Sequence, residues 1–140
     1  MSGGTSSRTG AAEAGAGEPV GETAPGRWVE ICALEAILPD TGVGALVGGK
    51  QVAVFRTGAT SNVYALQNFD PFSKAFVLCR GIVGDKAGVP KVTSPIFKQG
   101  YDLRTGQCLD DPTVKIRAYP ARVVDGRVEI FIADASRPGP

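Results

Sequence analysis

The sequence predicts an all-β fold, an antiparallel β-sandwich with long loops between its strands, on three observations. From Arg27 onward, short β-branched and aromatic runs are separated by Gly, Pro and Asp, which is the pattern of many short strands. Gly48-Gly49 and Asp125-Gly126 each lie between apolar runs and suit tight hairpins that need positive φ. Residues 127–132 place alternate side chains on opposite faces, with β-branched residues on one of them.

The individual strands are expected where β-branched and aromatic residues are densest. The predicted ranges are 28–32, 44–47, 51–56, 63–67, 76–78, 114–118, 122–124 and 127–132. After the first strand, residues 33–38 are expected to form one helical turn that Pro39 ends, because proline cannot continue a helix. In the last strand Phe131 lies opposite the predicted core face, so that second face is expected to be partly covered by a loop or a partner. The predicted core face of this strand carries Val128, Ile130 and Ile132.

One folded domain, residues 27–140, is expected to follow a disordered tail, residues 1–26. The tail consists almost wholly of small and polar residues, which cannot offset the entropy of ordering a chain. Within the domain, residues 69–111 are rich in Pro, Gly, Lys and Asp and are expected to form long loops with short strand pieces. Loops of this kind on a compact β domain commonly carry the function.

Composition excludes several classes of function. The 15 basic and 14 acidic residues give a net charge of +1, too little for a protein that follows the phosphates of a nucleic acid. Three cysteines far apart in the sequence argue against a disulfide framework or a zinc ribbon and fit reduced thiols. No apolar run approaches the roughly 20 residues of a membrane span, and no signal-peptide pattern is present. We therefore expect a soluble, cytoplasmic protein.

Two segments match the metal-binding phrases of a Rieske iron–sulfur protein and lack the ligands. Residues 94–106, SPIFKQGYDLRTG, keep the length and the ending of CPxHGxxFDxxTG, and residues 63–72, VYALQNFDPF, align with YAxxNxCPH. A Rieske centre needs two Cys and two His ligands, and this sequence contains no His. The vacated ligand positions are Asp70, Phe72, Ser94 and Phe97.

From Trp28 to about Asp134 the chain resembles the Rieske-like small subunits of assimilatory NAD(P)H-dependent nitrite reductase. The resemblance is carried by these two phrases, by a leading WVEIC…LP and by Cys108 after the TG ending. Cluster ligands are characteristically lost in that family. The resemblance implies a cytoplasmic partner, the large catalytic subunit, which carries FAD, an iron–sulfur cluster and sirohaem and reduces nitrite to ammonium with NADH. No cofactor or metal is then expected in this chain.

The residues at the vacated positions suggest a structural replacement for the metal. Phe72 and Phe97 have the size of a ring and are expected to fill the space that two imidazoles would have occupied. Asp70 and Ser94 are expected to accept hydrogen bonds from loop amides and to hold the two loops together.

Other chemistry finds little support, and no catalytic residue is expected. Without His, neither Ser nor Cys has its usual general base. Asp70, Asp102, Asp110 and Asp111 offer oxygen ligands but lack the spacing of a known cation loop and a His partner, so solvated loop acids are the simpler interpretation. Cys108, beside two of these carboxylates, is a poor candidate for a reactive thiol.

A docking surface is a further hypothesis for residues 69–111. Basic and aromatic residues are interleaved there, which suits an apolar centre with a charged rim. An ordinary solvated loop surface over a local aromatic cluster explains the same pattern. The residues in question are Arg80, Lys86, Lys91, Lys98 and Arg104 with Phe69, Phe72, Phe76, Phe97 and Tyr101.

The function that these observations favour is that of a non-catalytic small subunit of a nitrite reductase, which supports the large subunit. Two alternatives remain at this point. One is a Rieske-type, ferredoxin-like electron carrier, and the other is a stand-alone β-sandwich interaction module.

Overall fold

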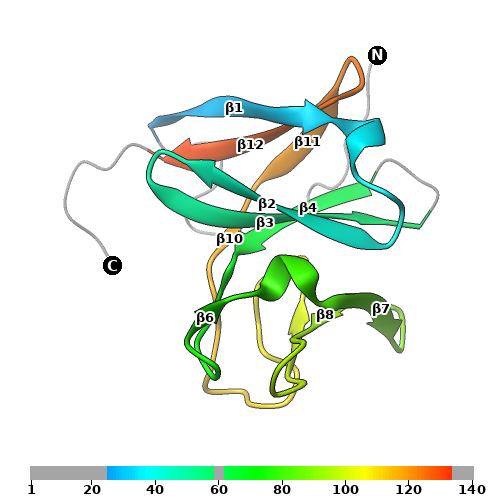
Figure 1. Ribbon diagram of the computed structural model, residues 1–140, viewed down its shortest axis with the longest axis vertical. Coiled ribbons are helices and arrows are strands. Elements are labelled where there is room, and N and C mark those ends of the chain that lie inside the picture. Colours follow the sequence, from blue (N-terminus) through cyan, green and yellow to red (C-terminus); the bar gives the residue numbers. More distant parts are fainter. Residues whose placement is uncertain (1–24, 59–61, 134–140) are drawn as a thin grey trace.

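The computed structural model describes residues 25–58 and 62–133, and in these ranges it is built from antiparallel β-strands (Figure 1). The expected tail, residues 1–26, falls outside the described residues except at its end, where the first strand begins with Gly26. The strands are β1 (Gly26–Ala33), β2 (Thr41–Val47), β3 (Lys50–Thr57), β4 (Asn62–Gln67), β5 (Phe69–Asp70), β6 (Ala75–Phe76), β7 (Ile82–Lys86), β8 (Val89–Thr93), β9 (Gly100–Asp102), β10 (Ala118–Tyr119), β11 (Ala121–Val124) and β12 (Arg127–Ala133). Two short 3₁₀ turns, η2 (Leu34–Ala36) and η3 (Leu78–Arg80), are the helical elements of the described residues.

The strands form three layers. One sheet has the order β1-β12-β11 and packs on a second sheet with the order β10-β4-β3-β2. The third layer contains the sheet β7-β8-β9 and the hairpin β5-β6, and it lies on the other side of the second sheet (Figure 1). The predicted all-β sandwich is confirmed, with this third layer added to it.

The middle sheet is buried on both faces, which explains its nearly continuous apolar strands. In β3, Val52 and Val54 point into the core shared with the β1-β12-β11 sheet, whereas Ala53 and Phe55 point into the core shared with the third layer. All four side chains are 0% exposed. The third layer, which carries the four Rieske ligand positions, therefore packs on a sheet whose central side chains are fully buried.

Six of the eight predicted strands are confirmed, including both hairpins. Gly48 and Gly49 have φ of 57° and 80°, and Asp125 and Gly126 have φ of 51° and 75°, as tight two-residue turns require. The helical turn expected at 33–38 is present as η2. Phe131 is 5% exposed, and Trp28 packs edge-on against it at 5.5 Å. Trp28 is its neighbour on strand β1 of the same sheet, so the expected cover by a loop or a partner is not what the described residues show.

Two predicted strands are wrong in part. In the range 76–78 only Phe76 lies in a strand, because Leu78 begins η3, and in 114–118 only Ala118 does. The loop segment also contains a regular three-stranded sheet, β7-β8-β9. The described residues include no helix long and apolar enough to cross a membrane.

Candidate functional site: two loops on one buried carboxylate

Two loops of the third layer contain all four vacated ligand positions. The first loop, residues 70–74 (DPFSK), joins β5 to β6, and the second loop, residues 94–98 (SPIFK), lies between β8 and β9. Each begins with an oxygen-bearing residue followed by proline, and each ends with a lysine. The two loops thus share a pattern of residue types at both ends.

Asp70 is the centre that joins these loops. Its side chain is 0% exposed, and one oxygen, Oδ2, accepts hydrogen bonds from Ser94 Oγ at 2.6 Å and from Ser73 Oγ at 2.9 Å. The other oxygen, Oδ1, accepts from the Tyr101 hydroxyl at 2.9 Å and from the Phe72 amide at 3.1 Å. The expectation that Asp70 and Ser94 hold the loops together is confirmed. The interpretation as solvated loop acids is wrong for Asp70 and for Asp102, which are both buried.

These hydrogen bonds favour the ionised form of Asp70. Burial alone raises the pKa of a carboxyl group, but the hydrogen bonds from Ser94, Ser73, Phe72 and Tyr101 outweigh it and hold the pKa of Asp70 below its ordinary value. Burial, followed by the hydrogen bond to Asp70, raises the pKa of Tyr101. Asp70 is therefore a carboxylate and Tyr101 a neutral phenol, so the donor and acceptor roles are fixed.

The turn of each loop is closed in a related way. The Phe72 amide donates to Asp70 Oδ1 in the first loop, and the Ile96 amide donates to Ser94 Oγ at 3.4 Å in the second. Lys74 and Lys98, the last residues of the two loops, both have positive φ, 57° and 68°. The same side chains that join the loops therefore also shape them.

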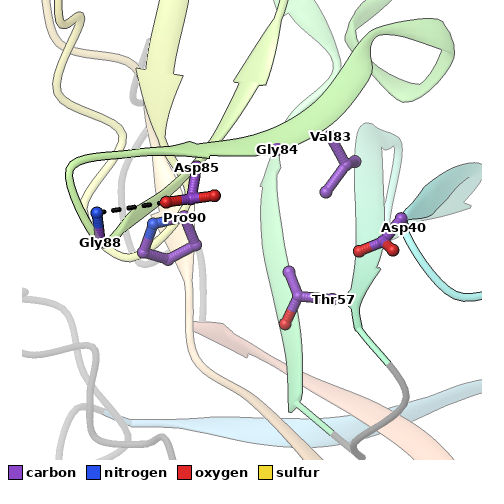
Figure 2. Close-up of a pocket in the computed structure, with 7 residues that line it drawn as sticks. All are labelled: Asp40, Thr57, Val83, Gly84, Asp85, Gly88 and Pro90. Carbon is purple, nitrogen blue, oxygen red and sulfur yellow. Dashed lines mark hydrogen bonds between the residues drawn. The ribbon is translucent and has the colours of Figure 1, made fainter.

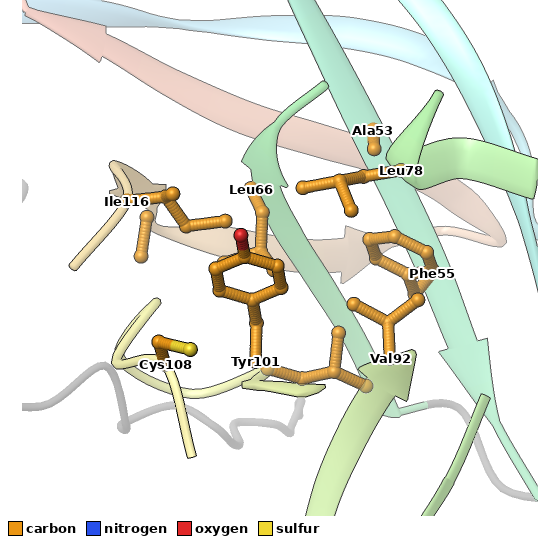
Figure 3. Packing of buried hydrophobic residues seen from close by; sticks show 10 residues of the cluster. Ala53, Phe55, Leu66, Leu78, Val92, Tyr101, Cys108 and Ile116 are labelled. Carbon is orange, nitrogen blue, oxygen red and sulfur yellow. The ribbon is translucent and has the colours of Figure 1, made fainter. Parts of the chain in front are cut away.

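Tyr101 and the rest of the retained ending have structural roles. Tyr101 is 0% exposed, and Figure 3 shows its ring among Leu66, Val92 and Ile116, with the hydroxyl inside the core. Asp102 accepts bonds from the Arg104 amide at 2.8 Å and guanidinium at 3.0 Å. Gly106 has φ of 83°, and a Cβ there would lie 2.1 Å from the Ile116 carbonyl oxygen. This ending is a tight turn that needs no metal.

Sequence reasoning missed two members of the network, Ser73 and the Tyr101 hydroxyl. A signal was present for the second one, because Tyr101 stands where the Rieske phrase has Phe. A hydroxyl gained there, together with a carboxylate at position 70, indicates a paired replacement. Ser73 gave no comparable signal.

Two expectations about the aromatic residues are wrong. Phe97 is 57% exposed and does not fill the space of an imidazole, and its neighbour Ile96 is 46% exposed. The interior is already occupied by Asp70, Ser94 and the Tyr101 ring, so the second loop presents its apolar side chains outward. Phe72 is half-buried and packs against the core of the third layer. That it fills the space of an imidazole stays a prediction. The second wrong expectation is the place of Tyr101 in a docking surface, because its side chain is 0% exposed.

The former cluster site does not fit an iron–sulfur cluster. A Rieske cluster needs thiolates and imidazoles, and the four positions offer a carboxylate, a hydroxyl and two phenyl rings. Both oxygens of Asp70 are engaged by donors, and Ser94 Oγ donates to Asp70. Among the described residues no group of three or more His, Cys, Asp or Glu is placed to hold a metal ion.

Away from the two loops, a depression lies between the β7–β8 hairpin, the start of β2 and the end of β3 (Figure 2). It has a volume of about 370 Å³, and Asp40 and Asp85 are its charged residues. Each carboxylate already accepts a backbone amide, from Gly58 at 2.7 Å and from Gly88 at 3.2 Å. These acids therefore stabilise turns, and the two loops remain the candidate site.

Known proteins of similar sequence and structure share this Rieske-like fold. A family model described as a Rieske-like [2Fe-2S] domain matches residues 27–131. The small subunit of nitrite reductase (NADH) from Salmonella typhimurium is 44% identical over 104 residues, which is 74% of this chain and 96% of that protein. A crystal structure of a candidate NADH-dependent nitrite reductase small subunit from Mycobacterium tuberculosis superimposes with a TM-score of 0.74 at 46% identity, covering 78% of this chain and 97% of that one.

A third relative is of a different kind. The nitrite reductase [NAD(P)H] large subunit from Klebsiella oxytoca is 45% identical over 112 residues, which is 80% of this chain but 11% of that protein. The same domain therefore also occurs as a small part of a much longer chain.

Proposed function

Since this chain belongs to the Rieske-like domain family, as one of the small subunits of NADH nitrite reductase, we propose that it works in a nitrite reductase complex as a non-catalytic subunit bound to the large subunit. The match to this chain spans 96% of the Salmonella protein and 97% of the Mycobacterium protein, so each comparison is with a nearly complete small subunit.

The observation that carries the proposal is the occurrence of this domain in both subunits. It forms nearly the whole of the Salmonella small subunit and a minor part of the Klebsiella large subunit. A domain that is a separate chain in one organism and part of the partner chain in another must work close to the rest of that partner. The natural partner of this chain is therefore a large subunit.

The chemistry of the four Rieske ligand positions supports a non-catalytic role. Asp70 is a buried, ionised carboxylate with all its donors inside the fold, so it has no free oxygen to move a proton or bind substrate. Phe72 and Phe97 contribute no ligand. Nitrite reduction transfers electrons, and the resemblance to the family implies that the FAD, sirohaem and iron–sulfur cluster that carry them lie in the large subunit.

A cytoplasmic location is part of the same proposal. Cys32, Cys79 and Cys108 are all free, and Cys108 is buried. Unpaired cysteines are typical of proteins kept in a reducing compartment.

The test is reconstitution with the cognate large subunit. Purified large subunit, with and without this chain, would be compared by size-exclusion chromatography with light scattering and by NADH-dependent formation of ammonium from nitrite. We expect a stable complex, and a higher or longer-lasting turnover when this chain is present. Equal assembly, stability and turnover with and without the chain would refute the proposal.

A ferredoxin-like carrier is the second candidate, since the matching family is described by a [2Fe-2S] cluster. Anaerobic incubation with iron and sulfide separates the two functions. We expect a colourless protein after desalting, because the vacated positions supply neither thiolate nor imidazole. A stable visible spectrum with a matching electron paramagnetic resonance signal on reduction would favour the carrier.

A further inference from the structure

We propose that the tip formed by the two loops, residues 70–74 and 94–98, is the surface by which this chain docks on the large subunit of nitrite reductase. This inference rests on the proposed function and adds the place of contact. The tip lies at the end of the molecule opposite the β1-β12-β11 sheet (Figure 1).

The tip exposes large apolar side chains at consecutive positions. Ile96 is 46% exposed and Phe97 is 57% exposed. Phe72, half-buried, belongs to the loop on the other side of the Asp70–Ser94 hydrogen bond. Exposed aromatic residues grouped in this way are the usual centres of protein interfaces.

The other exposed large apolar side chains are single residues on separate elements. Leu38 follows η2, Leu46 is in β2, and Val124 ends β11. In the third layer, Phe76 is in β6 and Ile82 begins β7, and neither has an exposed large apolar neighbour in the sequence. The second loop is the one loop of the described residues in which two neighbouring large apolar side chains are both exposed.

Hydrogen bonds to buried groups beneath the tip also hold its two loops in place. Ser94 Oγ and the Tyr101 hydroxyl both donate to the buried Asp70, and the Ser94 amide donates to the Gln99 carbonyl oxygen at 2.8 Å. A surface that is already ordered loses less conformational entropy on binding. The polar network in place of a metal thus keeps the apolar tip in a fixed shape.

Two lysines flank this apolar surface and indicate the chemistry of the partner. Lys74 and Lys98 are both exposed, and each has a positive φ, a region that favours glycine over residues with a Cβ. Within the described ranges, neither ammonium group is paired with a carboxylate. The Lys98 ammonium group has one acceptor in its own loop, the Pro95 carbonyl oxygen at 3.4 Å. Cations without a carboxylate partner, at positive φ on both loops, are explained by an acidic partner surface. We infer that the large subunit offers an apolar recess bordered by carboxylates.

The first test measures the affinity of the full chain for purified cognate large subunit by isothermal titration calorimetry. Phe97→Ser is compared with Leu46→Ser, a matched control in β2 at a residue that is 73% exposed. We expect Phe97→Ser to weaken binding at least tenfold and Leu46→Ser to change it less than twofold. Equal affinities for wild type and Phe97→Ser, or an equal loss in Leu46→Ser, would overturn the inference.

The second test uses Lys74→Gly and Lys98→Gly, which relieve positive φ and therefore preserve the fold. We expect each variant to melt at or above the wild-type temperature and to bind the large subunit several-fold more weakly at low salt. The difference from wild type should shrink as salt is added, because salt screens the ion pairs. Unchanged affinity in both variants at low salt would contradict the acidic partner surface.

These outcomes are separable from those of the proposed function. If wild type does not bind the large subunit at all, the proposed function fails. If wild type binds and the tip variants bind equally well, only the docking surface is wrong. Self-association of the free chain that Phe97→Ser abolishes, seen by sedimentation, would instead assign the tip to a second copy of this chain.

Discussion

Ser94 Oγ donates a 2.6 Å hydrogen bond to Asp70 Oδ2, and this bond joins the two positions at which a Rieske motif has cysteine. In a Rieske protein the two loops are held together by iron. Here a hydroxyl and a carboxylate do so, with a second hydroxyl from Tyr101 at 2.9 Å. The loops keep their relation to each other while the chemistry between them has changed from ligation to hydrogen bonding.

Asp70→Ala should destabilise the fold by about 3 kcal/mol, because it leaves the buried hydroxyls of Ser94 and Tyr101 without an acceptor, at about 1–3 kcal/mol for each unsatisfied group. Urea unfolding followed by circular dichroism measures the change. Glu35→Ala, at an exposed residue, is the control and should stay within about 0.5 kcal/mol of wild type. A loss in Asp70→Ala no larger than that of the control would show that the network contributes nothing.

Tyr101→Phe isolates the phenol hydroxyl. The ring still fills the core, and only the hydrogen bond to Asp70 is removed, so we expect a loss of about 1.5 kcal/mol. Tyr119→Phe is the matched control, since its hydroxyl has no hydrogen bond within the described residues, and should cost less than about 0.5 kcal/mol. Equal stabilities for the two variants, by the same urea unfolding, would mean that the hydroxyl of Tyr101 is dispensable.

The lowered pKa of Asp70 predicts a loss of stability in acid. A carboxyl group whose folded pKa lies below its unfolded pKa contributes stability that is fully present above the unfolded value, about 3.9, and is lost as pH falls through the folded value. We therefore expect the free energy of unfolding to fall from about pH 4 downward in wild type.

The control for this acid effect is Asp70→Asn, which carries no titrating group at this position. Its stability should depend less steeply on pH below about pH 4 than that of wild type. Some slope remains, because the hydrogen bonds from Thr113 also hold the pKa of Asp111 below its ordinary value. Identical slopes in the two proteins, from urea unfolding at a series of pH values, would show that Asp70 is not the group responsible.

The parts of the fold that the sequence predicts well are those in which several residues in a row face a core. Residues 51–56 gave a strand because β3 packs on both sides, and Val128, Ile130 and Ile132 gave β12 through their alternation. The sheet β7-β8-β9 escaped notice because each strand contributes one side chain to the core: Val83, Val92 or Tyr101. β7 and β8 each contain two β-branched apolar residues, but these are adjacent or three apart rather than alternating, and glycine, proline and charged residues fill the other positions, so there is no period of two to detect.

The candidate site was likewise predicted only in part from the sequence. The Asp70–Ser94 pair was predictable because both residues stand at recognisable motif positions and both can form hydrogen bonds. Phe97 was predicted wrongly, since its size alone favoured burial, and only the folded chain shows that Tyr101 already occupies the interior. Which of two aromatic rings takes a shared space depends on loop geometry, and the sequence does not contain that geometry in a local pattern.

Gly106→Ala tests whether the retained TG ending is a packing requirement. Gly106 and Gly88 have nearly equal φ, 83° and 86°, but a Cβ at Gly106 would lie 2.1 Å from the Ile116 carbonyl oxygen, whereas nothing lies within 4 Å of one at Gly88. Gly88→Ala should therefore cost only the backbone strain, about 1 kcal/mol. Gly106→Ala adds a clash with backbone that cannot turn away, and we expect a loss of more than about 3 kcal/mol or failure to fold. Thermal unfolding of the two variants measures the difference, and equal melting temperatures would leave positive φ as the sole reason for glycine at the end of this motif.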